Sequence, residues 1–250
     1  MKNFFKKYTF NIFILVISII TLCSVTFNIK LTIVNFHAEQ ECKINTEVNE
    51  LVIRNYDKYI KINPFDKYAY FVRGKAHFFA KDYKLALKDF KKSKTMGNDS
   101  DRLYNFLGNS YSYTNEIEKS IETFTEGLKI HKDNAILLNN RAYIKCINGY
   151  DLQDALKDVN ESLAIETAPE AYHTRAEIQR NLGFYQYAIS DAEKALEKAP
   201  DMYYNHCEKG YSHMKLGQKN QGLHHLGICK QASEAEGDDK YKSLYEEYLK

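Results

Sequence analysis

Residues 104–112 read YNFLGNSYS, and the small residue at the centre of this stretch, Gly108, marks a pattern that the chain repeats. The other copies read YFVRGKAHF, LNNRAYIKC, YHTRAEIQR and HCEKGYSHM. Each copy has Gly or Ala at its centre and a large residue four positions earlier. The centres are Gly74, Gly108, Ala142, Ala176 and Gly210, which follow one another at intervals of 34 residues. A fixed period of this length predicts a repeat array, in which most residues build the architecture.

Each repeat is predicted to form two helices. In the first helix the large residue, the small centre and the residue three positions later share one face, because positions i, i+4 and i+7 lie together on an α-helix. The missing side chain at the centre lets the second helix approach closely. The second helix has its own small and bulky positions, as at Ala86 with Phe90 and Ser120 with Phe124. Stacked pairs of this kind bury one continuous core and form a solenoid.

The pattern resembles the tetratricopeptide repeat, whose signature is W-x2-L-G-x2-Y, then A-x3-F, then P. Leu107, Gly108 and Tyr111 match the first half of that signature, and Ala86 with Phe90 matches the second half. The resemblance covers residues 67–236. It implies an all-α fold, a right-handed superhelix of about five helix pairs with a concave and a convex side. It implies a partner-binding surface but does not identify the partner.

The predicted domains follow this spacing. The five repeats are placed at residues 67–100, 101–134, 135–168, 169–202 and 203–236. Residues 47–66 are predicted to be a degenerate half-repeat, a capping helix that covers the edge of the first repeat, because Pro64 precedes Gly74 as Pro200 precedes Gly210. Residues 237–250 are predicted to form a C-terminal capping helix whose apolar face includes Tyr241.

The first thirty residues differ from the rest in composition. The 22 residues between Lys7 and Lys30 carry no charge, and as a helix they would span about 33 Å, enough to cross a membrane. We therefore predict a cytoplasmic tail at residues 1–7, a transmembrane signal-anchor at 8–29 and a tether at 30–46. The lysines before the span predict repeats on the non-cytoplasmic side, periplasmic or extracellular. A cleaved signal peptide is the alternative.

Charge and motifs argue against several classes of function. Beyond Lys30 the chain has 31 basic and 33 acidic residues without a basic block, so nucleic acid is not an expected partner. The sequence has no Gly-rich phosphate loop, no H-E-x-x-H and no G-x-S-x-G. We expect no catalysis, no cofactor and no small-molecule substrate.

The last repeat concentrates cysteine and histidine. The chain has five cysteines and no C-x-x-C, which argues against a disulfide framework, although Cys207 and Cys229 lie on the two helices of one predicted pair. His206 and His213 with a cysteine would suit zinc, and a metal-dependent enzyme is the corresponding alternative. Because these two histidines occupy positions that other repeats fill with packing residues, we expect a structural role and no metal.

In the family that the sequence resembles, first helices line the concave surface. Carried onto this chain, the resemblance implies a groove of aromatic, amide and charged side chains. The candidates are Phe71, Lys75, Phe78, Asn105, Asn109, Tyr113, Asn139, Asn140, Tyr143, Thr174, Glu177, Arg180 and Tyr211. Amide side chains both donate and accept, so the asparagines suit the backbone of an extended peptide. A branch of the family clamps a terminal carboxylate with basic residues, and Asn105 stands where the first lysine would be.

The sequence therefore predicts a membrane-anchored tetratricopeptide-repeat scaffold. Its partner would be another protein or an extended peptide segment, bound in the concave groove, and the amino-terminal helix would hold it in the membrane. Two alternatives remain open. One is a secreted or periplasmic adaptor released by signal cleavage. The other is a permanent structural assembly factor of a membrane complex.

Overall fold

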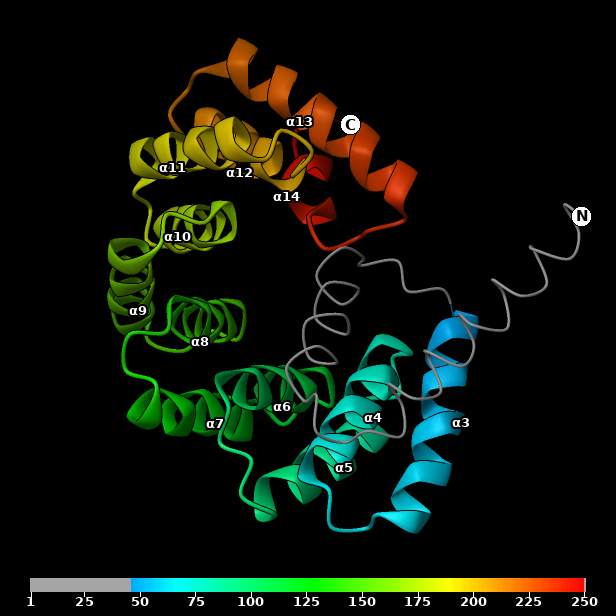
Figure 1. Ribbon diagram of the computed structural model, residues 1–250. Helices are drawn as coiled ribbons and strands as arrows, with labels where there is room; N and C mark the ends of the chain where they lie inside the picture. Colours follow the sequence, from blue (N-terminus) through cyan, green and yellow to red (C-terminus); the bar gives the residue numbers. More distant parts are fainter. Residues whose placement is uncertain (1–45, 250) are drawn as a thin grey trace, which may run out of the picture. The chain divides into compact units, whose positions relative to one another are not determined.

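The computed structural model describes residues 46–249, and the regular elements in that range are α-helices (Figure 1). Residues 49–250 form one compact unit, to which α4 to α14 belong. Between residues 46 and 249 no helix is long and apolar enough to span a membrane. The predicted tail and signal-anchor, and the tether up to residue 45, lie outside the described residues.

Five helix pairs, with the turns between them, span residues 67–236. The predicted all-α solenoid is confirmed. The pairs are α4 (Lys67–Phe79) with α5 (Tyr83–Thr95), α6 (Asp101–Tyr113) with α7 (Ile117–Ile130), α8 (Ala135–Ile147) with α9 (Leu152–Ile165), α10 (Pro169–Asn181) with α11 (Tyr185–Lys198), and α12 (Tyr204–Lys215) with α13 (Lys219–Glu236). Each helix packs against the next one in the chain, and Figure 1 shows the pairs following one another in sequence order.

In the three repeats whose centre is glycine, that centre lies against the bulky position of the second helix. A Cβ atom built on Gly108 would come within 2.7 Å of the Phe124 ring, and one built on Gly74 within 2.7 Å of Phe90. Both rings are completely buried. The glycines therefore allow a large aromatic ring to fill the space between the two helices, as the sequence pattern predicts.

The turn inside each pair places one residue in the left-handed region. The five residues are Lys81, Asn115, Gly149, Gly183 and Gly217, with φ between 62° and 80°. They repeat every 34 residues, and a positive φ at this place directs the chain from the first helix into the second. Glycine adopts this conformation freely, whereas a residue with a Cβ is strained there.

Buried ion pairs join the two helices in three repeats. The Arg141 guanidinium binds both carboxylate oxygens of Asp158, at 2.7 and 2.8 Å. Arg73 binds Asp89, and Arg175 binds Asp191, in the same bidentate geometry. These arginines stand one residue before the small centre. Their role is to hold the pair together, since their carboxylate partners are almost fully buried.

The two ends of the array differ from the repeats. The first helix, α3 (Thr46–Ile62), is linked to the first repeat by the Asp57–Arg73 ion pair, at 2.7 Å. Ile60 on this helix is buried, while Leu51 is 53% exposed. At the other end α14 (Lys242–Glu246) is shorter than the helix predicted for residues 237–250. Gly237, with φ of 66°, ends α13, and a loop precedes α14.

Candidate functional site

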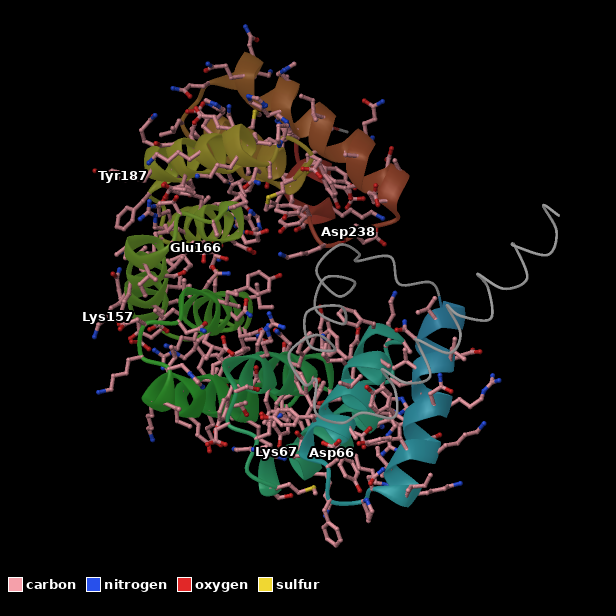
Figure 2. The ribbon with its side chains drawn as sticks, in the orientation of Figure 1. Asp66, Lys67, Lys157, Glu166, Tyr187 and Asp238 are labelled. Carbon is pink, nitrogen blue, oxygen red and sulfur yellow. A yellow bond between two sulfur atoms is a disulfide. The ribbon has the colours of Figure 1, made fainter. Side chains whose placement is uncertain are left out.

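The first helices of the repeats form one continuous inner row. In the order α4, α6, α8, α10 and α12, each first helix contacts the next, and among the described helices α5 to α13 no such contacts join second helices of neighbouring repeats. The first helices are therefore closer together than the second helices, so the solenoid curves with the inner row on its concave side. Lys157 and Tyr187, on α9 and α11, point away from it in Figure 2. All thirteen predicted groove residues lie on first helices.

An aromatic cluster occupies the inner row at α4 and α6. The Phe78 ring lies 5.2 Å from Phe106 and 5.7 Å from Tyr113, measured between centroids. Tyr113 also stacks on Tyr83 at 4.4 Å, and it remains 62% exposed. Phe71 and Phe78 pack against the core of the first two repeats, so they serve the fold as well as the surface. The Lys75 ammonium lies 5.4 Å from the centroid of Phe106.

The predicted asparagines bond mainly to one another. Asn105 Oδ1 accepts hydrogen bonds from Asn109 Nδ2 at 2.8 Å and from Asn140 Nδ2 at 2.7 Å. This network crosses from α6 to α8 and fixes the orientation of three amides. The Asn139 Oδ1 atom is different, because it is buried and has no hydrogen-bond partner.

A compact group of buried charges occupies α10 and α12. The Arg180 guanidinium lies 2.6 Å from a Glu208 oxygen and 3.7 Å from a Glu177 oxygen. Burial raises the pKa of Glu208 to about 7, against the opposing attraction of Arg180. Burial also lowers the pKa of His173 to about 4, although Glu177 at 3.7 Å favours its protonation. The group therefore holds two carboxylates around one guanidinium.

The remaining candidates have different surroundings. Thr174 is buried and donates its hydroxyl proton to the Glu170 carbonyl oxygen within α10. Tyr211 is half-buried, and Arg180 lies 5.6 Å from its ring centroid. The Tyr143 hydroxyl accepts a hydrogen bond from Lys240 Nζ at 2.8 Å.

The contact between Tyr143 and Lys240 shows that the carboxyl-terminal segment returns to the inner row. Lys240 Nζ also lies 3.5 Å from a Glu177 carboxylate oxygen. The hydroxyl of the neighbouring Tyr241 is hydrogen-bonded to His173 Nε2 at 3.0 Å. A hollow of about 320 Å³ lies beside this segment, lined on one side by Asn139 and other first-helix residues and on the other by Lys240 and Tyr241.

The sequence does not predict that Lys240 reaches the inner row. The 34-residue period carries no information about this residue, because the terminal segment lies outside the repeats. The apolar pattern of residues 237–250 did indicate that Tyr241 is buried, and it is 4% exposed. No sequence signal paired it with His173.

The expectation of no disulfide is wrong. Cys207 and Cys229 form a disulfide between α12 and α13, with their Cα atoms 5.0 Å apart. The helix pair brings the two residues together across 22 positions, which cysteine spacing does not show. Nearby, the Nδ1 atoms of His206 and His225 lie 3.0 Å apart. In residues 46–249 no group of three or more metal-binding side chains is arranged to hold an ion.

Comparison with known proteins supports the repeat assignment. The sequence model of the tetratricopeptide repeat matches residues 101–134. A DnaJ homolog subfamily C member 7 homolog from Dictyostelium discoideum is 27% identical over 198 residues, which are 71% of this chain and 36% of that protein. The small glutamine-rich tetratricopeptide repeat-containing protein 2 of Saccharomyces cerevisiae is 31% identical over 122 residues, 48% of this chain and 33% of that protein. The chain thus spans about a third of the length of these relatives.

Solved structures share the fold at low sequence identity. The APC/C assembly Cut9–Hcn1 superposes with a TM-score of 0.68 at 15% identity, covering 82% of this chain and 40% of that one. YrrB, described as a TPR protein with an unusual peptide-binding site, superposes with a TM-score of 0.57 at 16% identity, covering 78% and 98%. These similarities concern the architecture.

Proposed function

The chain is a tetratricopeptide-repeat protein, and we propose that it binds a segment of another protein along the inner row and performs no catalysis. The observation that carries the proposal is Tyr113. Its ring is 62% exposed although it stacks on Tyr83 and contacts Phe78. A ring that neighbouring side chains already hold in place offers apolar contact area at a small entropic cost.

The amides of α8 add a polar part to the same surface. Asn139 Oδ1 is buried without a hydrogen-bond partner, and Asn139 borders hollows of about 320 and 330 Å³. A buried acceptor without a partner is unfavourable, and the backbone N–H of an extended peptide would satisfy it. The peptide-binding site described for YrrB, which has the same fold, is consistent with this proposal.

Photo-crosslinking tests the proposed surface. A benzoylphenylalanine at position 113 is expected to crosslink a partner protein in cells or membranes. The matched control is position 187, where the natural residue is also tyrosine, is 68% exposed and lies on the outer side of α11. Adducts from position 113 and none from 187 are expected. Equal adducts from both positions, or adducts from 187 alone, would contradict binding along the inner row.

We also propose that residues 8–29 anchor the protein and that the repeats lie on the non-cytoplasmic side of the membrane. The disulfide between Cys207 and Cys229 supports this location. Structural disulfides persist in the periplasm, in the lumen of the endoplasmic reticulum and outside cells, and they are rare in a reducing cytosol. The charge difference across the uncharged stretch favours the same orientation.

The topology is tested by protease treatment of the full chain in sealed membranes, with a tag after Lys250 and mass determination of the amino terminus. An intact Met1 with repeats shielded from cytoplasmic-side protease is the expected result. A new terminus near Glu39 would indicate the cleaved, soluble adaptor instead. Digestion from the cytoplasmic side would contradict the orientation. Loss of the repeats from the membrane fraction without partner subunits would favour a permanent assembly factor.

A further inference from the structure

The loop between α13 and α14 lies against first helices that are far away in the sequence. Figure 2 marks its start at Asp238, whose carboxylate accepts a hydrogen bond from the Tyr203 hydroxyl at 2.7 Å. Further along, Lys240 reaches α8 and α10. Its ammonium donates to the Tyr143 hydroxyl at 2.8 Å, lies 4.8 Å from the centroid of the same ring and is 3.5 Å from Glu177. The lysine thus meets a phenol and a carboxylate on two different repeats.

The charges around Lys240 explain why a cation is needed there. The side chains of Glu177 and Glu208 are 8% and 0% exposed, and Arg180 is the cation that both approach on the inner row. Lys240 supplies the second positive charge. A buried charge that loses its partner is strongly unfavourable. The site therefore favours a cation at this position, whichever chain provides it.

Tyr241 fills the adjoining aromatic part of the site. His173 Nδ1 donates to the Asn205 side-chain oxygen at 3.0 Å, so Nε2 of the neutral ring accepts from the Tyr241 hydroxyl, also at 3.0 Å. The Tyr241 ring lies nearly parallel to Tyr204, at 17° and 6.1 Å between centroids. Lys240 Nζ donates to the Tyr241 oxygen at 2.6 Å, which couples the two residues of the pair.

We propose that the surface formed by α8, α10 and α12 recognises a lysine followed by an aromatic residue in an extended segment of a partner protein. The chain's own Lys240–Tyr241 pair occupies that surface as an internal competitor. This inference rests on the proposed function, because it describes the chemistry of a segment bound on the same inner row.

Space next to the pair suits a longer occupant. The hollow of about 320 Å³ continues from Lys240 and Tyr241 to Asn139 and Asn140 on α8. A partner segment with the same lysine and aromatic residue would extend into this hollow and, by displacing the side chains that cover it, reach the Asn139 oxygen, which has no partner in the closed arrangement. The partner would thereby gain a contact that the internal pair does not make.

The first test compares full-length chains in detergent for binding of a labelled synthetic peptide with the sequence of residues 237–250. Lys240→Met removes the internal cation and so weakens the hold of the internal pair on the site. The matched control is Lys242→Met, which removes the same charge two residues away, where the partners of the lysine at 3.6 and 3.8 Å, Asp239 and Glu246, are exposed. Because the occupied site must open before the peptide binds, Lys240→Met is expected to bind the peptide about tenfold more tightly or better. Lys242→Met is expected to behave as the unaltered chain does.

The second test changes the peptide and the site in the Lys240→Met background. A peptide with Met in place of the lysine corresponding to Lys240 is expected to lose about tenfold in affinity or more, because a charge-assisted hydrogen bond is lost. Substituting the lysine corresponding to Lys242 should have little effect. On the protein, Tyr143→Phe and Glu177→Gln should each weaken binding. Tyr143→Phe keeps the ring, so its effect is separable from misfolding by an unchanged thermal melt.

Three outcomes would overturn the inference. They are equal affinity of the Lys240→Met and Lys242→Met chains, equal affinity of the lysine and methionine peptides, and absence of peptide binding to every chain. The last result would mean that residues 240–241 are a fixed part of the fold. If crosslinks from position 113 persist in any of these cases, the proposed protein-binding function stands and only the lysine–aromatic specificity fails. Loss of the position 113 crosslinks with intact peptide binding would instead contradict binding at α4 and α6 and leave the lysine–aromatic recognition in place.

Discussion

At the scale of single residues, each small side chain on a first helix faces a side chain on the second helix, and the sizes of the two are complementary. Where the centre is Gly108, the second helix carries Phe124, which is completely buried. Where the centre is Ala142, the corresponding side chain is the smaller Val159. Helix separation is therefore set by the combined size of two positions about one half-repeat apart, and close packing leaves little room to enlarge either.

Gly108→Ala is expected to destabilise the protein by about 1–2 kcal/mol. Overpacking costs about 1–3 kcal/mol, and the better helix propensity of alanine returns up to about 1 kcal/mol. The new Cβ would meet the Phe124 ring at 2.7 Å. Urea unfolding measures the change. The control is Gly227→Ala in α13, where nothing lies within 4 Å of the new Cβ and stability should rise slightly. An equal gain at both positions would disprove the packing argument.

Two arginines of equal geometry are expected to differ in importance. Arg175→Met leaves the buried Asp191 with Lys194 at 3.5 Å, on a side chain that is 46% exposed. Arg141→Met leaves Asp158 with the buried Lys145 at 2.7 Å. Removing a partner of a buried charge costs about 3–5 kcal/mol, so we expect that loss for Arg175→Met and about 1–2 kcal/mol less for Arg141→Met. Chemical denaturation measures the loss of unfolding free energy in each variant. A larger loss for Arg141→Met than for Arg175→Met would contradict the explanation.

At the scale of elements, the last pair is held differently from the others. The pairs α4–α5, α8–α9 and α10–α11 are joined by arginine–aspartate ion pairs, whereas α12 and α13 are joined by the disulfide. The disulfide lies in the same cluster as Leu226, Tyr241 and Tyr245, so it stabilises the packing of α14 as well. The strength of this pair therefore depends on the redox conditions around it.

Reducing the Cys207–Cys229 disulfide is expected to destabilise the last pair by about 3 kcal/mol, because the reduced chain regains loop entropy when it unfolds. Hydrogen exchange should become faster in α12, α13 and α14. Exchange in α4 to α7 should remain unchanged, since each repeat of a solenoid contacts only its neighbours. A Cys207→Ala/Cys229→Ala chain should reproduce the effect and should no longer respond to reductant. Uniformly faster exchange along all repeats would contradict the local account.

At the scale of the whole molecule, buried titrating groups give stability a dependence on pH. His173 has a pKa lowered to about 4, chiefly by burial, and Glu208 has a pKa raised to about 7 by the same cause. The unfolded chain protonates His173 more readily, so stability from this group falls as the pH drops below about 6.5. The folded chain protonates Glu208 more readily, so stability from that group falls as the pH rises from about 4.5 to 7.

His173→Gln isolates the histidine contribution. Between pH 7.5 and pH 5 the unaltered chain should lose about 2 kcal/mol relative to this variant, which follows from the separation of the folded and unfolded pKa values. Urea unfolding at the two pH values measures the difference. His224→Gln is the control, because His224 is exposed, and it should change with pH as the unaltered chain does. The same pH-dependent difference in both variants would show that the effect does not come from burial of His173.

The repeat, the small centres and the helix pairs could all be predicted from the sequence. These features depend on contacts within one repeat or between neighbours, as between Gly108 and Phe124, and a period of 34 residues records such contacts directly. The resemblance to the repeat family also implied that first helices line the groove. It did not show that Asn105, Asn109 and Asn140 bond to one another.

The position of the terminal segment and the pairing of the cysteines became visible only in the folded protein. Lys240 meets Tyr143 across 97 positions, and Tyr241 meets His173 across 68. A segment outside the repeats follows no period, so its position depends on the charges and hollows that the folded array presents. Glu177 and Glu208 share the Arg180 guanidinium only once α10 and α12 are adjacent, and the buried Glu177 carboxylate attracts Lys240 because a buried charge needs a partner.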